Sequence, residues 1–292
     1  MKNRTELLVM ILPTAVLFFI FLYLPMFGLV LAFREYDVIG GLMGHSWAGL
    51  KYFKQFFADP YCFRIIRNTV MLNLYMLVFA FPASIIFTLI VNEVKQKSIR
   101  KTYQTISYLP HFVSTVIIVG IMFDMFSSRG VVNQAMNLFG IKNQLFFQNA
   151  NMFRPLYVGS SIWDGLGWNS IVYFAALAAI NPELYECASI EGAGRFAKII
   201  HVTIPGILPT IVIMFILTVG SLFTVAFEKV LLMYNPGVYE KADVIATYVY
   251  RRGILGMDYS YSTAVGMFNS VANFILLLGA NYLSRKAGHG LW

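Results

Sequence analysis

The chain has 292 residues, and 12% of them are charged, about half the ~25% that is typical of soluble domains. Hydrophobic residues make up 58% and aromatic residues 16%, with a net charge of +8. A soluble globular domain would need more polar surface and a disordered chain fewer apolar side chains, so both classes are excluded in favour of a membrane protein.

Six long apolar stretches follow one another along the chain, each with one charge at most. A helix needs about 17–25 residues to cross ~30 Å of hydrocarbon, and each stretch meets that length. Runs such as 212–223 are apolar on every face and lack the alternation of barrel strands, so the stretches predict helices. The expected spans are 7–33, 69–91, 106–123, 157–180, 204–227 and 264–283. The predicted fold class is therefore all-α, a polytopic membrane protein with six transmembrane helices.

The first stretch could instead belong to a signal peptide, because Lys2 and Arg4 precede it as a basic start would. It is too long for the 7–15-residue apolar core of such a peptide, and no A-x-A-like cleavage site follows. We therefore expect a retained helix, kinked at Pro13, Pro25 and Gly28.

The distribution of basic residues predicts the orientation in the bilayer. If the N-terminus is inside, the short inner segments are denser in Lys and Arg than the outer loops. The tight loop at 95–101 and the pair Arg285 and Lys286 directly after the last span follow this rule. Cytoplasmic N- and C-termini are therefore expected. No loop combines clustered basic residues with interleaved aromatic ones, so no nucleic-acid partner is expected.

Sequence motifs for catalysis and metal binding are absent. No GxxxxGK[ST] pattern occurs, so the chain has no P-loop of its own, and neither a Gly-x-Ser-x-Gly motif nor a Cys/His pair suggests a nucleophile. Cys62 and Cys187 are too few for a disulfide framework or a thiolate zinc site. We expect no enzyme, no metal site and no cofactor bound by this chain. The histidines lie in separate segments without a partner at ligand spacing: His45, His111, His201 and His289.

The segment between the fourth and fifth stretches has the clearest local chemistry. Asn181 suits an N-cap and Pro182 the first helical position, which predicts a short helix at about 182–191. Gly192 and Gly194 then predict a turn.

A second short helix is expected to carry Phe196, Ile199 and Ile200 on one side, with Pro205 and Pro209 marking the return to the membrane. Such a helix–turn–helix at the cytoplasmic surface suits insertion into a groove on another protein.

This segment resembles the EAA loop of ABC importer permeases, with its E-A-A-x(3)-G pattern and trailing I-x-L-P. The departures are Cys187 for the middle Ala and Ile204 for the Leu before Pro205. The chain also resembles the sugar-permease branch, and most closely its LplB-like carbohydrate permeases, at 23–36, 47–53, 67–69 and 108–110. The matching loop positions are Glu186, Ala188, Glu191, Gly192, Ala193, Phe196, Ile199, Pro205 and Pro209.

The resemblance implies a MetI-like transmembrane domain of a type I ABC importer. Residues 1–67 would form the N-terminal helix and first extracellular loop, 68–284 the core with coupling helices at about 181–205, and 285–292 a short cytoplasmic tail. Coupling to the ATPase would fall on Glu186, Ala188, Glu191, Gly192, Ala193, Phe196, Pro205 and Pro209.

The implied function is import of a carbohydrate, specifically an oligosaccharide, across the cytoplasmic (inner) cell membrane. The implied partners are a second homologous permease, a dimer of cytoplasmic ABC ATPases that binds ATP and Mg, and an extracellular solute-binding protein. The long outer loops at 35–68 and 231–261 are the candidate docking surface for that protein, or else they pack on the outer face of the bundle.

Polar and aromatic side chains inside the apolar stretches are candidates for contact with a sugar, because polar groups are costly in a membrane. Asp164, flanked by Trp163 and Trp168, is the strongest candidate. The alternative is that the tryptophans lie at the membrane interface and the asparagines bond between helices. The candidates are Asn73, Asp124, Trp163, Asp164, Trp168, Asn169, Asn269 and Asn273.

Two other classes of function remain open. A self-sufficient secondary transporter or channel would need intramembrane charge pairs, broken helices or an inverted repeat, and the sequence has no convincing internal symmetry. A membrane-embedded enzyme would need a catalytic cluster, which the sequence lacks.

Overall fold

The computed structural model describes residues 2–37, 40–41 and 46–286. Helices dominate these residues, and β-structure in them is limited to isolated bridges of Arg34 with Trp47 and Asp37 with Gly41. The chain divides into two compact units, Met1–Cys62 with Tyr248–Ser270, and Phe63–Thr247 with Val271–Trp292. Parts of the predicted first outer loop (38–39 and 42–45), most of the predicted tail (287–292), His45 and His289 lie outside the described residues.

The first unit begins with a continuous helix whose type changes along its length. Pro13 lies inside its first part, and Pro25 follows a π-helical turn, where the wider backbone leaves room for a residue without an N–H. The helix consists of α1 (Lys2–Phe18), the π-helical Phe19–Tyr23, α2 (Leu24–Met26) and the 3-10 helical Phe27–Phe33. The unit also holds α3 (Lys51–Ala58) and the π-helical Tyr250–Leu255, and it shares α15 (Ile245–Val249) and α16 (Tyr259–Lys286) with the second unit.

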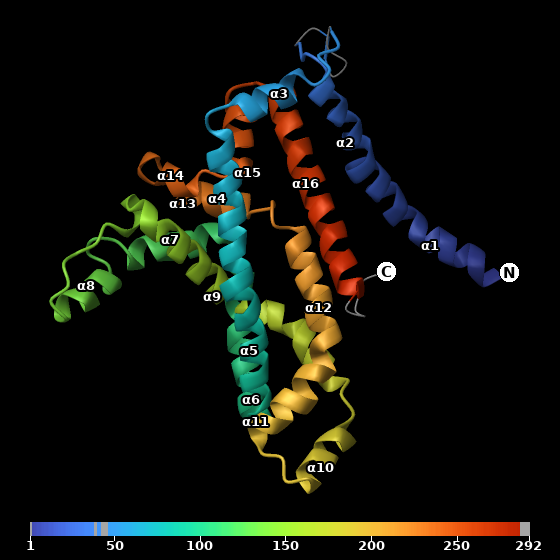
Figure 1. The fold of residues 1–292 in the computed structure, drawn as a ribbon, viewed down its shortest axis with the longest axis vertical. Coiled ribbons are helices and arrows are strands. Elements are labelled where there is room, and N and C mark those ends of the chain that lie inside the picture. The colour runs from blue at the N-terminus through green and yellow to red at the C-terminus, as the bar shows by residue number, and fades with distance from the viewer. Residues whose placement is uncertain (1, 38–39, 42–45, 287–292) are drawn as a thin grey trace. The chain divides into compact units, whose positions relative to one another are not determined.

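The second unit contains most of the helices, and in it α9 crosses and contacts α5 (Figure 1). Its first half comprises α4 (Cys62–Tyr75), the π-helical Met76–Ala80, α5 (Phe81–Asn92), α6 (Lys97–Tyr108), the 3-10 helical Leu109–Phe112, α7 (Thr115–Met125), α8 (Val131–Leu138) and the 3-10 helical Phe146–Gln148. Its second half comprises α9 (Ala150–Ala178), α10 (Pro182–Ile190), α11 (Arg195–Lys198), the π-helical Ile199–Thr203, α12 (Ile204–Gly220), α13 (Phe227–Met233), the 3-10 helical Pro236–Val238 and α14 (Tyr239–Ala242).

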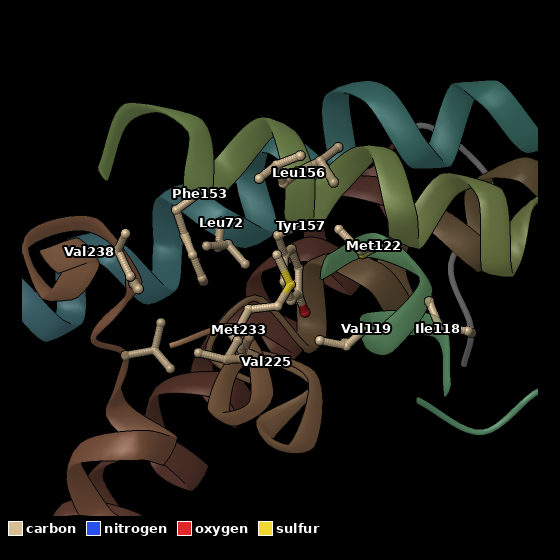
Figure 2. Packing of buried hydrophobic residues seen from close by; sticks show 14 residues of the cluster. Leu72, Ile118, Val119, Met122, Phe153, Leu156, Tyr157, Val225, Met233 and Val238 are labelled. Atoms are coloured by element: carbon tan, nitrogen blue, oxygen red, sulfur yellow. The ribbon is translucent and has the colours of Figure 1, made fainter. Parts of the chain in front are cut away.

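The hydrophobic core of the second unit lies where α7, α9 and α13 meet. Phe153 and Tyr157 of α9 are almost fully buried there, together with Met233 of α13 and Val119 of α7 (Figure 2). Burying one such large apolar side chain contributes roughly 1.5–3 kcal/mol. This core fixes α9, the helix that carries four of the eight substrate-path candidates, against α7 and α13.

Within the described residues, four helices are long and apolar enough to cross a membrane: Leu8–Phe33, Cys62–Asn92, Arg195–Gly220 and Tyr259–Lys286. The pair Lys97–Phe112 and Thr115–Met125 adds a fifth if the two helices form one span. α9 has 29 residues, about 44 Å of helix, and covers most of the predicted fourth span, although it is not one of these helices. The all-α polytopic membrane fold is confirmed, and these helices are consistent with six spans.

The prediction of a single straight helix for the third span, 106–123, is wrong. The chain bends by 98° between Phe112 and Thr115, so the span is not one straight helix. Pro110 cannot donate a helical hydrogen bond, and Ser114 Oγ accepts from Ile117 N at 3.4 Å, which starts α7 in a new direction.

The fifth span also differs from the prediction at both ends. It does not continue to residue 227 but ends at Gly220, and residues 221–226 are irregular. At its start, α11 runs through the π-helical Ile199–Thr203 into α12, so the expected separate second helix does not exist. The π-turn changes the hydrogen-bond register just before Pro205, which lets the helix continue through a residue that lacks an N–H.

Candidate functional site

The predicted coupling loop forms α10, a turn and the start of the long helix Arg195–Gly220, and it lies at the end of the second unit where α5 ends (Figure 1). α10 covers the predicted helix at 182–191 to within one residue. Asn181 Oδ1 accepts from Glu183 N at 3.0 Å, and Asn181 Nδ2 donates to Glu183 Oε2 at 3.0 Å. The first turn of α10 is thus capped as its sequence predicts.

Gly192 ends α10 in the left-handed conformation, with φ of +78°. Its N–H donates to Ser189 O at 3.1 Å, and Ala193 N donates to Ala188 O at 2.9 Å, which satisfies carbonyl groups of the last turn. A Cβ at Gly192 would meet no atom within 4 Å. Glycine is therefore required here for its backbone conformation and not for space.

Two side-chain hydrogen bonds tie α10 to the helix that follows. The Tyr185 hydroxyl and Thr203 Oγ1 lie 3.1 Å apart, and Thr203 is buried. Lys198 Nζ donates to Ser189 Oγ at 2.7 Å. Lys198 and Thr203 belong to the continuous helix Arg195–Gly220, so these bonds join α10 to a helix that is long and apolar enough to cross a membrane.

Large apolar side chains are exposed on the helix–turn–helix, which comprises α10, the turn at Gly192 and α11. Ile190 is 86% exposed and Phe196 83% exposed, and Leu184 is also exposed. Such a group of exposed apolar side chains on one short loop is typical of a protein-binding surface. Most of the predicted coupling residues are exposed as well, namely Glu186, Glu191, Gly192, Phe196, Pro205 and Pro209, while Ala188 and Ala193 are half-buried.

The polar candidates for the substrate path do not converge on one place. Asn73 Nδ2 donates to Leu222 O at 2.9 Å. Asn273 Oδ1 accepts from Phe223 N at 2.8 Å, and its Nδ2 donates to Thr224 Oγ1 at 2.8 Å. Both asparagines therefore support the irregular segment 221–226, in line with the alternative explanation of bonds between helices.

Asn273→Ala is expected to lower the stability of the permease by about 1–3 kcal/mol, because it removes an acceptor and a donor that hold the irregular segment. Thermal unfolding of the detergent-solubilised protein measures this effect. Asn169→Ala, at an exposed position of α9, is the matched control and should change stability by no more than about 0.5 kcal/mol. Equal unfolding temperatures for Asn273→Ala and wild type would contradict the assignment.

Asp164 and the two tryptophans lie on α9, where Trp163 and Trp168 are each nearly half exposed. The Trp168 ring stacks on His111 with 4.3 Å between ring centroids. A groove of about 410 Å³ between α7 and α9 is lined by Met122, Trp163 and neighbouring apolar side chains. The other candidates are scattered: Asp124 is exposed on α7, Asn169 is exposed on α9, and Asn269 Oδ1 is buried on α16 without a hydrogen-bond partner among the described residues.

The structure adds Lys229, which the sequence does not single out. Lys229 is only 4% exposed, its Nζ donates to Ser161 Oγ at 3.0 Å, and it lies 5.6 Å from the centroid of the Tyr157 ring. The negative charge of Asp164 acts on this ammonium group. In the sequence, Lys229 looks like an ordinary charge after an apolar stretch, because the return of α13 into the core cannot be predicted from its neighbours.

Comparison with known proteins decides the family. A family model described as "Binding-protein-dependent transport system inner membrane component" matches residues 80–289. The chain belongs to this family. The permease is 43% identical over 287 residues to Protein LplB of Bacillus subtilis. This alignment covers 98% of the present chain and 90% of LplB. The permease is 40% identical over 287 residues to the polygalacturonan/rhamnogalacturonan transport system permease protein YteP of the same species, covering 98% and 89%.

Solved structures agree with the sequence relatives. A chain of a bacterial alginate ABC transporter, solved in complex with an alginate pentasaccharide-bound periplasmic protein, matches the permease with a TM-score of 0.90 and 41% identity. The match covers 99% of this chain and 97% of that one. The predicted membership of the ABC importer permeases, and with it a multi-pass membrane protein, is confirmed.

Proposed function

We propose that the permease is one subunit of an ATP-driven importer that carries a carbohydrate, specifically an oligosaccharide, into the cell. The match over nearly its whole length to a chain of an alginate ABC transporter carries this proposal. The relative YteP, named for polygalacturonan and rhamnogalacturonan transport, points to the same class of substrate. The exposed apolar surface of the helix–turn–helix supports a role in binding another subunit.

The permease pairs with a second homologous permease in the cytoplasmic membrane, with both termini inside. A dimer of ABC ATPases, which holds ATP and Mg, grips α10 from the cytoplasm, and an extracellular binding protein delivers the substrate. Closure of the ATPases displaces α10, and its bonds through Tyr185 and Ser189 carry this rigid-body motion into the helix Arg195–Gly220. Hydrolysis of ATP belongs to the partner subunits.

The outer segment 231–261 supports docking of the binding protein. In the first unit, Ile254 and Leu255 at the end of the π-helical Tyr250–Leu255, and Met257 just after it, are all more than half exposed. Met257 has a positive φ of 54°, which is uncommon for a residue other than glycine. Strained backbone that presents apolar side chains is typical of a binding surface.

Transport in reconstituted vesicles tests the proposed function. Uptake of a labelled oligosaccharide should require ATP, the ATPase subunits and the binding protein together. Uptake by the permease alone would contradict the proposal and favour a secondary transporter or channel. Chemical conversion of a lipid-borne substrate without uptake would favour an enzyme.

Asp164 lies on the path of the sugar, and its negative charge also acts on the buried Lys229. Mutation can separate these two roles. Asp164→Ala is expected to abolish uptake and also to lower the unfolding temperature of the permease, because the buried Lys229 ammonium then loses the negative charge that acts on it. The double variant Asp164→Ala/Lys229→Met removes the buried cation and should regain the wild-type unfolding temperature without regaining uptake. Uptake at the wild-type rate by the double variant would show that Asp164 serves Lys229 alone.

A further inference from the structure

A second groove, of about 460 Å³, lies on the second unit between the helix containing α4 and the helix α9, with Lys241 of α14 at its edge. We name it the α4–α9 groove. The residues of this groove used below are Tyr75, Phe79, Arg154, Val158, Ile162 and Lys241.

Positive charge gathers at one end of the α4–α9 groove. Arg154 donates from its terminal nitrogen to Asn68 Oδ1 at 3.0 Å, and its guanidinium carbon lies 5.9 Å from the centroid of the Tyr75 ring. Lys241 Nζ hydrogen-bonds Asn151 Oδ1. The Arg67 charge also acts on Arg154, and the Glu240 carboxylate acts on Arg154 with the opposite sign. The end of the groove therefore has a net positive charge that suits an anion.

The rest of the groove is apolar and has the length of one bilayer leaflet. Val158 and Ile162 continue the stripe of α9 that begins at Asn151, and eleven residues of helix span about 16 Å. Half of the ~30 Å hydrocarbon core is about 15 Å. Phe79, one turn after Tyr75, lines the same apolar part from the facing helix.

The depth of the charged end fits the hydrocarbon boundary. The charge-free stretch of the second span begins at residue 69, and Arg154 bonds to Asn68, directly before it. Phe79 lies ten residues into this stretch, about 15 Å deeper and so near the bilayer midplane. The groove therefore begins at the level of the lipid headgroups and ends at the level of the acyl-chain termini.

We propose that the α4–α9 groove binds an anionic phospholipid of the outer leaflet. The phosphate accepts hydrogen bonds from Arg154 and Lys241, and an acyl chain lies along Val158 and Ile162 toward Phe79. An oligosaccharide fits less well, because its hydroxyl groups would meet no hydrogen-bond partners along the apolar part. This inference does not depend on the identity of the transported solute.

Native mass spectrometry of the complete importer complex, after stepwise removal of lipid, tests the proposal. Phosphatidylglycerol serves as the anionic probe and phosphatidylcholine as the zwitterionic one. Arg154→Gln and Lys241→Gln should each weaken phosphatidylglycerol binding about fivefold. Arg154→Lys keeps the charge and should bind nearly as well as wild type. Lys142→Gln removes an exposed cation away from the groove and should leave binding unchanged.

Several results would overturn the proposal. Equal retention of both lipids, or full binding by Lys241→Gln, would show that the cations do not hold a phosphate. Displacement of phosphatidylglycerol by an oligouronate, with the same sensitivity to Lys241→Gln, would make the groove a saccharide site. If Arg154→Gln fails to assemble into the importer complex, lipid binding by Lys241→Gln and Arg154→Lys still tests the proposal. Both variants are expected to assemble, because Lys241 lies at the edge of the groove and Arg154→Lys retains the positive charge.

Discussion

Replacing Gly192 with proline is expected to abolish ATP-driven uptake and transport-stimulated ATP hydrolysis while leaving the permease in the membrane. Gly192 has φ of +78°, whereas the proline ring fixes φ near −65°. The substitution also removes the hydrogen bond from Gly192 N to Ser189 O. The turn after α10 must then change course, and α10 no longer meets the ATPase in register with the helix Arg195–Gly220. Uptake and ATPase activity in vesicles measure the loss.

Gly140→Pro is the matched control for this variant. Gly140 has φ of +73°, its N–H bonds to Asn137 O at 3.0 Å, and a Cβ there would meet no atom within 4 Å. It lies after α8, in a segment expected on the outer side, so uptake should persist. Gly192→Ala should cost about 1–2 kcal/mol of local strain and retain part of the activity. Substantial ATP-driven uptake by Gly192→Pro would rule out a coupling role for this turn.

Local chemistry made the coupling loop predictable from sequence. The bounds of α10 follow from Asn181 and Pro182 at one end and from Gly192 at the other, all within a dozen residues. The long apolar stretches likewise predict helices, because an exposed backbone has no hydrogen-bond partner in hydrocarbon. Both arguments need only neighbours in the sequence.

The course of the chain through the membrane depends on contacts that the sequence does not show. Span five ends at Gly220 because distant side chains, Asn73 and Asn273, can satisfy the irregular backbone that follows. These bonds also indicate a structural role for the two asparagines, which the sequence placed on the substrate path: both hold the irregular segment after span five. Lys229 was missed for a related reason, since only the fold of α13 onto α9 buries it. Periodicity and apolarity carry no information about such pairings.

Phe196→Asp is expected to weaken binding of the ATPase subunits about 30-fold or more. Phe196 is 83% exposed, so its replacement costs the permease little folding energy, while a buried aromatic anchor at an interface contributes about 2 kcal/mol or more. The carboxylate adds a further penalty, because it would enter an apolar contact without a partner. Titration of the purified ATPase onto membranes containing the permease measures the affinity directly.

Phe139→Asp separates this effect from a general loss of surface hydrophobicity. Phe139 is 82% exposed, nearly the same as Phe196, and follows α8 in a segment expected on the opposite side of the membrane. If the ATPase binds at the helix–turn–helix, Phe196 contacts the ATPase and Phe139 does not. Phe139→Asp should then bind the ATPase with wild-type affinity. If the two variants weakened binding equally, the exposed surface of α10 and α11 would not be the place where the motor grips the permease. A selective loss for Phe196→Asp, together with the proline effect at Gly192, would locate force transmission in this one loop.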